Sequence, residues 1–496
     1  MTRFAFVIDQ SRCIGCHACT VACKMENHVP VGVFRTWVKY IERGEFPNSR
    51  RFYAILRCNH CDNAPCVRIC PTSALYYRSD GIVDFDKGKC IGCKACMQAC
   101  PYDALYIDPD DNTAAKCHFC AHRIEQGLEP ACVIVCPTRA ILWGDIDDPA
   151  SSISKVLRDN PVTARKPEQG TKPKLYYIGA DQHVLTPMAH RRESTYMWSD
   201  VIEEDRVGGA LATDSQVAYD IPHSSPWGLK IATYIYTKAI ATGLMVMLSI
   251  LMLLFPRDLG PQALTLIPLL SLFFLGVTAL LLVLDLKRPL RFVYVILRPN
   301  LSSWLSRGSL LILAFGLVII LWILWRNETL IVPTLLIAGA TAGYSGLLFG
   351  QCEGRDFWQS PSALPHFVFT APQAGTALLV LLMPVLQVHG GIQSFLGGSL
   401  ALWNTVVTLI IVSDLLQRHT TTEAEAAKSY LVKGRGALPF WTMTFTLGGI
   451  VSTVMAILYS ASLNYNYGLV ASLASLSGLA VYEALWIRAG QIAPLS

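Results

Sequence analysis

The chain has 496 residues, more than a single ordinary domain contains, and 52% of them are hydrophobic. Its formal net charge of +5 is small for this length, and it has no basic stripe of the kind that binds nucleic acid. We therefore expect no nucleic-acid partner. All of its 17 cysteines except Cys352 precede residue 140, whereas the apolar residues concentrate after Trp227. This asymmetry predicts a cysteine-rich N-terminal domain followed by a membrane domain.

The N-terminal residues Met1–Asp9 contain neither a basic stretch followed by an apolar core nor a twin-arginine pair. We therefore expect the cysteine domain to carry no export signal of its own. A disulfide framework would require an oxidising compartment, and nothing in this sequence points to one.

The cysteines before residue 140 fall into four groups of four. The groups are Cys13, Cys16, Cys19 and Cys23; Cys58, Cys61, Cys66 and Cys70; Cys90, Cys93, Cys96 and Cys100; and Cys117, Cys120, Cys132 and Cys136. The third group has the bacterial ferredoxin spacing, in which three cysteines bind one cluster and the fourth, before Pro101, binds another. The first group has Lys24 in place of the proline, and the second and fourth contain a lengthened interval. Groups of three plus one that pair reciprocally match four [4Fe–4S] clusters.

Zinc is the alternative, because paired Cys-x-x-Cys motifs also build structural zinc sites. Zinc favours two separated pairs, whereas three evenly spaced cysteines with a fourth before proline favour a cluster. Alternating segments between the groups, at 81–85 and 104–107, predict hairpin strands. Five cations flank the cysteines and are candidates to raise cluster potentials, with a solvated surface role as the alternative. They are Lys24, Arg57, Arg68, Lys94 and Lys116.

Together the four groups resemble the four-cluster electron-transfer subunit of molybdopterin oxidoreductases, the family of dimethyl sulfoxide, polysulfide and thiosulfate reductases and Nrf proteins. The resemblance covers residues 1–190 and implies a small α+β domain of the double bacterial-ferredoxin type. It also implies which cysteines share a cluster: Cys13, Cys16 and Cys19 with Cys136; Cys117, Cys120 and Cys132 with Cys23; Cys58, Cys61 and Cys66 with Cys100; and Cys90, Cys93 and Cys96 with Cys70. It further implies that the clusters of the first and fourth groups face the membrane.

We predict that residues 191–227 form a linker strap, preceded by a strand at Leu175–Ile178 that closes the first domain. Eight apolar segments follow, each close to the about 20 residues that span a bilayer. Their predicted bounds are Ile231–Phe255, Ala263–Leu284, Leu310–Trp325, Leu330–Gly350, Phe367–Leu386, Leu396–Leu416, Leu438–Tyr459 and Gly468–Ile487. Residues 228–496 are therefore expected to form an all-α bundle of eight transmembrane helices. Gly339, Gly343, Gly346 and Gly350 predict close helix packing in the fourth helix.

Lysines and arginines concentrate in the loops on the N-terminal side of these helices, whereas the opposite loops hold only Arg257 and Arg326. The positive-inside rule then places the cluster domain on the cytoplasmic side of the bacterial inner membrane. The alternative is export of the cluster domain together with a partner that carries a signal, as several members of the family do.

The loops Leu284–Ser309 and Gly350–Pro361 are similar to those of the NrfD/polysulfide reductase anchor family, a resemblance that covers residues 227–490. Usually the two halves are separate subunits, and here they are fused. The resemblance implies a site for menaquinone or ubiquinone at the membrane face nearest the clusters. It also implies a separate molybdopterin-containing catalytic subunit, because this chain has no length left for a pterin-binding fold.

A quinol loses two protons with its two electrons, so the site needs hydrogen-bonding or titratable groups at the bilayer edge. Lys230, Tyr234 and Lys238 are spaced to share one helix face, and His223 and Arg288 lie near the same membrane edge in the sequence. These five residues are the candidate quinone contacts. For Lys230 the alternative is that its side chain only snorkels, placing the ammonium at the membrane–water interface.

The remaining ionisable residues have weaker assignments. Asp285, Arg288, Glu353, Arg355 and Asp356 are expected mainly to form ion pairs beneath the cluster domain, with a proton entry route as the alternative. Free Cys352 is expected to be a small buried apolar residue. Asp414 and Glu483 are the candidates for a proton path.

The predicted function is that of an electron-transfer and anchor subunit, which reacts with quinone but leaves other substrate chemistry to its partner. The alternatives are a proton-translocating module and a zinc-stabilised scaffold. The third, fifth and seventh helices hold almost no titratable residues, which argues against a proton channel.

Overall fold

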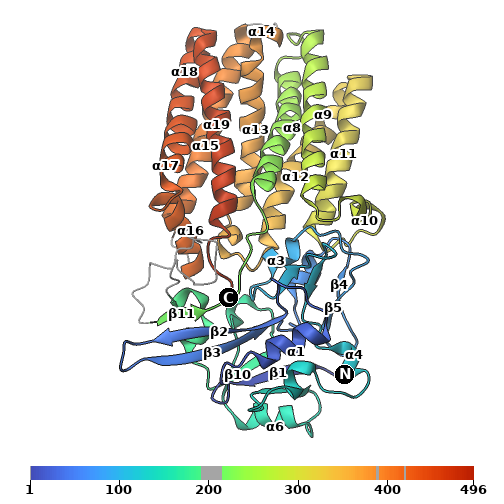
Figure 1. The fold of residues 1–496 in the computed structure, drawn as a ribbon. Helices are drawn as coiled ribbons and strands as arrows, with labels where there is room; N and C mark the ends of the chain where they lie inside the picture. The colour runs from blue at the N-terminus through green and yellow to red at the C-terminus, as the bar shows by residue number, and fades with distance from the viewer. Residues whose placement is uncertain (1, 191–214, 387–389, 418–420) are drawn as a thin grey trace.

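A computed structural model describes residues 2–190, 215–386, 390–417 and 421–496. Figure 1 shows a domain of short strands and helices that lies against one end of a bundle of long helices. The C-terminus lies at the junction of the two parts, and the N-terminus lies on the far side of the small domain. This arrangement confirms the predicted order of a ferredoxin-like domain followed by an all-helical domain.

The small domain is built on two sheets and two hairpins. Its strands are β1 (Phe4–Asp9), β2 (Thr36–Arg43), β3 (Arg50–Arg57), β4 (Leu75–Tyr77), β5 (Val83–Phe85), β6 (Leu105–Ile107), β7 (Ala114–Lys116), β8 (Ile141–Asp145), β9 (Val162–Thr163), β10 (Leu175–Ile178) and β11 (Ser215–Tyr219). One sheet has the order β8-β1-β10-β9 and the other has the order β11-β2-β3, while β4-β5 and β6-β7 form the hairpins. Strand β10 pairs in parallel with β1, so it closes the domain as predicted.

Of the predicted linker strap, residues 191–214 lie outside the described residues. The part that follows is not a free strap throughout, because β11 pairs antiparallel with β2 and extends its sheet. Residues 220–227 then lead directly to the first long helix.

Five short helices carry or border the cysteines. They are α1 (Ala18–Glu26), α2 (Pro65–Ile69), α3 (Ala95–Ala99), α4 (Ala121–Ile124) and α5 (Ala131–Ile134). The residues before α1, α3 and α4, which are His17, Lys94 and Cys120, have left-handed backbone angles with φ of 59°, 63° and 51°. These turns reverse the chain sharply, so that cysteines before a helix and cysteines on it face the same space. Two further helices, α6 (Ser152–Asp159) and α7 (Gln182–Leu185), lie outside the cysteine groups.

Among the described residues of the second part, eight helices are long and apolar enough to cross a membrane. They are α8 (Leu229–Leu254), α9 (Pro261–Asp285), α11 (Trp304–Trp325), α12 (Ile331–Gly350), α13 (Ala363–Leu381), α15 (Gly390–Leu416), a π-helical stretch Phe440–Val451 continued by α18 (Ser452–Ser462), and α19 (Tyr465–Ala489). Short helices α10 (Tyr294–Leu297), α14 (Met383–Leu386), α16 (Thr422–Val432) and α17 (Ala437–Pro439) lie between them. Three long helices start four or more residues earlier than predicted: α11 at Trp304 rather than Leu310, α13 at Ala363 rather than Phe367, and α15 at Gly390 rather than Leu396. The extensions hold polar residues, glycine or proline, which lower the hydropathy but are compatible with the start of a helix.

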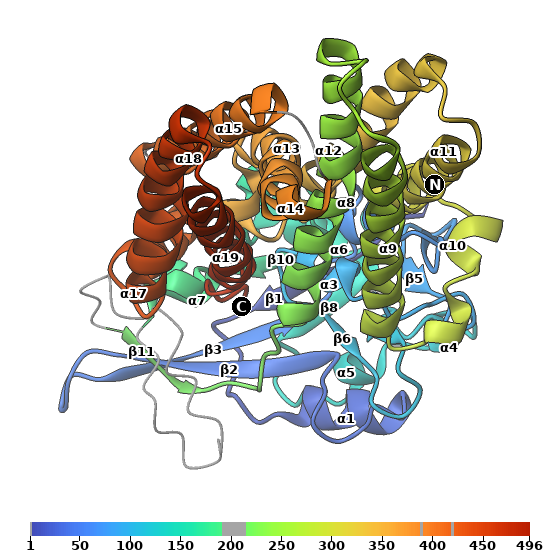
Figure 2. The same cartoon turned by 90° about the horizontal axis from the view of Figure 1, so that it is seen from above.

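The long helices form two four-helix bundles. In the first bundle α8, α9, α11 and α12 contact one another in a ring, and in the second α13, α15, α18 and α19 do so. Figure 2 shows the two groups side by side, seen along the helices. The bundles are joined where α8 packs against α13. At that seam Gly243 faces the backbone of Ala371 and Gly375, and a Cβ on Gly243 would overlap the Ala371 carbonyl.

The prediction that four glycines of the fourth helix pack closely against a neighbour is correct for two of them. A Cβ on Gly346 would lie 2.7 Å from the Leu364 Cα, and one on Gly343 would touch the side chains of Val368 and Leu364, so both glycines let α12 approach α13 closely. A Cβ on Gly339 or Gly350 would meet no atom within 4 Å, so the prediction is wrong for these two. The spacings of four, three and four residues keep all four glycines near one helix face, and only Gly343 and Gly346 lie at the level where α12 and α13 approach each other closely.

Candidate functional site

The cysteines of the small domain converge into four sets, each drawn from two of the sequence groups. We name these sets by their members: site I is Cys13, Cys16, Cys19 and Cys136; site II is Cys23, Cys117, Cys120 and Cys132; site III is Cys58, Cys61, Cys66 and Cys100; and site IV is Cys70, Cys90, Cys93 and Cys96. Sites I, III and IV each line a separate small cavity. In site II the Asn27 amide lies 3.7 Å from the Cys23 Sγ and 3.8 Å from the Cys120 Sγ. The four sets are those that the resemblance implies.

The geometry of these sets fits iron–sulfur clusters better than single ions. A zinc ion needs its sulfur ligands at about 2.3 Å from one point. Within the described ranges, no three His, Cys, Asp or Glu side chains lie close enough together to hold a metal ion. Thiols that surround a space rather than a point suit a cuboid cluster, so the donor set disfavours the zinc alternative.

Backbone amides donate to the thiol sulfurs, as expected at iron–sulfur sites. The amides of Ala74 and Ala114 lie 3.2 and 3.3 Å from the sulfurs of Cys70 and Cys90. At site I the Ala140 amide lies 3.2 Å from the Cys136 Sγ. Hydrogen bonds to cluster sulfurs are one means by which a protein sets cluster potentials.

Burial raises the pKa of several of these thiols. It raises the pKa of Cys19 and of Cys93 to about 12, and that of Cys100 to about 11. A cluster binds thiolates, so ligation at these positions releases protons and replaces buried thiols by metal-bound sulfur.

Two of the five flanking cations lie inside the small domain. Arg57 and Lys116 are 0% exposed. The Arg57 Nη1 donates to the Cys132 Sγ at 3.1 Å, and the Lys116 Nζ donates to the carbonyls of Val83 and Cys117. These two residues have the buried environment in which a charge acts strongly on a neighbouring cluster.

The other three cations have structural partners. Lys94 pairs with Asp285 of α9 at 2.8 Å, and Arg68 pairs with Glu353 of the loop after α12. Lys24 donates to two backbone carbonyls of its own loop. The ion pairs expected of Asp285 and Glu353 are therefore confirmed, and they join the two domains.

Site IV lies against the membrane domain. The Asn300 side chain donates to the Cys70 carbonyl at 2.8 Å, Arg291 donates to the Cys90 carbonyl at 3.0 Å, and the Trp227 indole donates to the Cys93 carbonyl at 3.3 Å. Figure 1 shows α3, which carries Cys96, against the long helices, and α1 farther from them. The expectation that the clusters of the first and fourth groups face the membrane is therefore wrong. The loops after α9 and α12 contact the second and third groups instead. Cys16 of site I is exposed to solvent.

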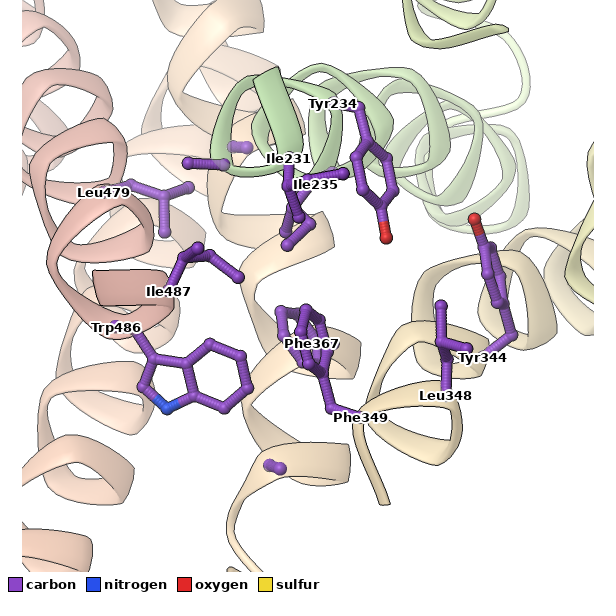
Figure 3. Packing of buried hydrophobic residues seen from close by; sticks show 14 of the residues in the cluster. Ile231, Tyr234, Ile235, Tyr344, Leu348, Phe349, Phe367, Leu479, Trp486 and Ile487 are labelled. Carbon is purple, nitrogen blue, oxygen red and sulfur yellow. The ribbon is translucent and has the colours of Figure 1, made fainter. Parts of the chain in front are cut away.

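A cavity of about 170 Å³ opens between α8, α9, α11 and α12 on the side of site IV. We call it the interface cavity. Cys93 and Ile91 form part of its wall, and most of the remaining lining is aliphatic. Its polar groups are Tyr234, Tyr344, Asp285 and Ser309. Figure 3 shows the hydroxyl groups of Tyr234 on α8 and Tyr344 on α12 pointing into the same space.

Of the five candidate quinone contacts, Tyr234 alone is among the residues that line this cavity. Lys238 lies behind the wall, where its Nζ donates to the Ser345 hydroxyl at 2.5 Å and to the Ala342 carbonyl at 3.0 Å. The same Nζ is 4.3 Å from the centre of the Tyr344 ring. Lys230 is exposed and donates to the Leu284 carbonyl at 3.1 Å, which fits the interfacial alternative.

His223 and Arg288 lie outside the cavity and connect the domains. Burial lowers the pKa of His223, but Asp220 and Asp103 outweigh it, so that this pKa lies above its ordinary value. The Arg288 Nε donates to the Asp111 carbonyl at 2.6 Å. Arg355 likewise donates to the Gln98 side chain at 2.8 Å.

The sequence reasoning missed Tyr344 and His366. Tyr344 lies within the glycine-rich fourth helix, and its place inside a predicted membrane span was the one signal available from the sequence. His366 was overlooked because α13 begins before the apolar run does. Its Nε2 lies 3.0 Å from the Glu483 Oε1, and both side chains are buried. The fifth helix, predicted to hold almost no titratable residues, therefore holds one that lies just before its predicted start. Cys352 is fully buried, as predicted.

A second polar group lies deeper in the second bundle. The Gln373 side chain donates to the Asn404 Oδ1 at 2.8 Å, and the Ser475 hydroxyl donates to the same oxygen at 2.8 Å. The Asn404 Nδ2 donates to the Ser452 hydroxyl at 2.6 Å. Gln373 is two helical turns beyond His366, or about 10 Å farther from the cluster domain.

Comparisons with known proteins agree with this division of the sequence. A family model described as a 4Fe-4S dicluster domain matches residues 12–75, and another of the same description matches residues 50–146. The model described as polysulphide reductase, NrfD, matches residues 219–494.

The similar curated proteins match the N-terminal part. The B subunit of tetrathionate reductase from Salmonella typhimurium is 45% identical over 203 residues, which are 40% of this chain and 81% of the relative. The protein NrfC of Escherichia coli is 46% identical over 179 residues, 36% of this chain and 80% of the relative. A dimethyl sulfoxide reductase iron-sulfur subunit, named as putative, from Halobacterium salinarum is 37% identical over 256 residues, 45% of this chain and 96% of the relative. The chain therefore belongs to the NrfD/polysulphide reductase family and carries its iron–sulfur domain, of the 4Fe-4S dicluster type, in the same polypeptide.

Proposed function

We propose that the chain relays electrons through four [4Fe–4S] clusters between a molybdopterin-containing catalytic subunit and a membrane quinone, either menaquinone or ubiquinone. It does so as the electron-transfer and membrane-anchor subunit of a respiratory reductase complex. One observation carries the proposal: Cys93 of site IV forms part of the wall of a cavity inside the helix bundle. A redox centre and a hydrophobic binding space thus share one boundary.

The interface cavity has the chemistry that a quinone ring requires. Small-molecule sites are mostly apolar and contain a few convergent polar groups. The hydroxyls of Tyr234 and Tyr344 supply such groups within the bundle, and Asp285 supplies a carboxylate at its edge. Quinone takes up two electrons and two protons to become quinol, and the reverse reaction releases both. Asp285, paired with Lys94 next to Cys93, is the proposed proton acceptor.

The other end of the relay is site I. Cys16 is exposed to solvent, so a cluster there would lie at the protein surface. The tetrathionate and dimethyl sulfoxide reductase relatives are named as subunits, which supports a separate catalytic subunit as the partner of this protein. The identity of the terminal substrate would then belong to that partner.

The proposed location is the bacterial inner membrane, with the cluster domain on the cytoplasmic side. Arg257 and Arg326 lie in the loops α8–α9 and α11–α12, at the end of the bundle that faces away from the cluster domain. The basic residues of the other loops lie next to the cluster domain, which supports this orientation.

Proton translocation is the second candidate function, and the polar groups of the second bundle favour it. His366 and Glu483 form a buried pair, in which the His366 Nδ1 and the Glu483 Oε2 have no hydrogen-bond partner among the described residues. Ionisable residues inside a membrane span are candidates for function by default. The group around Gln373 and Asn404 would continue a path from this pair into the bundle.

Replacing Cys93 by Ala tests the relay. The variant should lose quinol-linked turnover and keep turnover with a soluble dye, because the dye bypasses the last cluster. Iron content should fall from about sixteen toward about twelve atoms per chain. The control is Cys352→Ala, which removes a buried cysteine outside the four sites. Full quinol-linked turnover in the Cys93 variant would contradict the proposal.

Replacing Tyr234 or Tyr344 by Phe tests the cavity. Each change removes one hydroxyl and preserves the ring, so we expect quinol oxidation to slow about tenfold or more. Iron content and dye-linked turnover should not change. Tyr459→Phe, in the second bundle, is the matched control. If the cavity variants and the control behave alike, quinone binds elsewhere.

Glu483→Gln tests the second candidate function. In proteoliposomes with active wild-type protein, proton movement beyond that of quinone chemistry itself should be abolished, while electron transfer continues. Glu328→Gln, in the loop far from the cluster domain, serves as the control. Wild-type proteoliposomes without any such excess proton movement would exclude this function.

A further inference from the structure

Arg57, the last residue of β3, is enclosed between site I and site II. Its side chain is 0% exposed. The Nη1 donates to the Cys132 Sγ of site II at 3.1 Å. Cys132 and Cys117 of site II and Cys19 of site I are all near enough to the guanidinium to interact with its charge. One guanidinium therefore lies near two cysteine sets, both of which are built from the first and fourth sequence groups.

The surroundings of Arg57 are apolar. Its Cζ lies 4.6 Å from the centre of the Phe6 ring. Phe6, Phe119 and Ile55 belong to one buried core that also includes Cys19 and Cys132. Charges interact more strongly in such a medium than in water, because little solvent screens them.

Two donors of this guanidinium have no hydrogen-bond partner in the part of the chain that the structure describes. The Nε and Nη2 of Arg57 are buried and make no hydrogen bond with any described residue. Buried donors are normally paired, and an unpaired one is costly to the folded state. Iron–sulfur clusters carry sulfur acceptors and a net negative charge together with their thiolates. The unpaired donors belong to a side chain that contacts Cys132 of site II and lies near Cys19 of site I, so they fit such acceptors.

We infer that Arg57 is a positioning residue that holds a permanent positive charge between sites I and II and raises the reduction potentials of both clusters together. The inference rests on the proposed four-cluster assignment. Each reduction adds one electron, and hence one negative charge, to a cluster, and no bond forms or breaks. A fixed opposite charge nearby favours that reduced state. Arginine suits this position because it stays protonated at all accessible pH values and donates in several directions.

Sites III and IV provide an internal comparison. Arg68 also flanks cysteines, but its side chain is 45% exposed and pairs with Glu353. Solvent and the carboxylate both reduce its effect on a cluster. The structure thus places two arginines next to cysteines, one with an uncompensated buried charge and one with a neutralised surface charge.

The test is a potentiometric titration of the purified full chain, followed by electron paramagnetic resonance. Arg57→Gln removes the charge and keeps a side chain that can donate to the Cys132 Sγ. Two of the four clusters should shift to lower potential, so that their reduced-to-oxidised ratio at the wild-type midpoint falls at least tenfold. The other two should keep their potentials. Arg68→Gln is the matched control and should shift none.

Arg57→Lys distinguishes charge from packing. Lysine keeps the positive charge but lacks the planar set of N–H donors of arginine. The reduction potentials of the same two clusters should therefore shift by less than in the Gln variant. Wild-type potentials at all four clusters in an iron-loaded Gln variant would overturn the inference, and so would an equal shift of all four. If the Gln variant fails to bind iron, the Lys variant decides the question: a shift in the potentials of the other two clusters, or an equal shift of all four, would overturn the inference.

Failure of this inference can be told apart from failure of the proposed function. The same preparations are assayed for iron and for quinol-linked electron transfer. If the wild-type chain holds about sixteen iron atoms and the Arg57→Gln variant keeps wild-type reduction potentials, only the role of Arg57 is rejected. Wild-type protein with far less iron, or with no reaction with quinol, rejects the relay on which it rests.

Discussion

One physical constraint shapes the protein. The charged cluster site IV must lie next to the interface cavity, while the cluster itself stays outside the apolar helix bundle. The hydrocarbon core of a membrane excludes charge. The structure meets the constraint by extending loops of the membrane domain to the cluster domain. Asn300, Arg291 and Trp227 donate to backbone carbonyls of three cysteines in site IV. The contact is made through the backbone, so it fixes the position of the site without competing for the thiols.

The same contact explains how the two halves are held together. Lys94 and Asp285 pair across the boundary at the edge of the interface cavity, and Arg68 and Glu353 pair farther along it. The C-terminal segment adds a further link, because the Gln491 side chain bonds both Gln98 and the Trp227 backbone. The boundary is therefore built from residues of several distant segments.

Much of the architecture could be predicted from the sequence, for physical reasons. Cysteine spacing reports ligand geometry directly, and the family resemblance supplied the pairing that spacing leaves open. Eight spans followed from hydropathy because a bilayer requires about 20 apolar residues in a row. The start of α13 could not be found this way, since Pro365 and His366 interrupt the apolar run, and with it His366 was lost as a partner of Glu483.

Which cysteine set faces the membrane could not be predicted either. That choice depends on how the loops after α9 and α12 fold onto the third group, and no periodicity encodes such docking. The candidate quinone contacts show the same limit. Tyr234 and Lys238 share a helix face, but Tyr234 lines the cavity while Lys238 is covered by Ser345 and Tyr344 of α12. The partner helix decides the outcome. Lys238 also lies 5.7 Å from the ring centre of Phe367 on α13, the neighbour of His366, so a titratable group stands between the two bundles.

The most direct test of the central claim uses the isolated chain without any catalytic subunit. Its clusters are reduced with dithionite, the excess reductant is removed, and a membrane quinone is added in detergent or nanodiscs. The account predicts that visible absorption recovers as the clusters give their electrons to quinone, and that quinol forms at one molecule per two electrons. Clusters that stay reduced in the presence of quinone would contradict it.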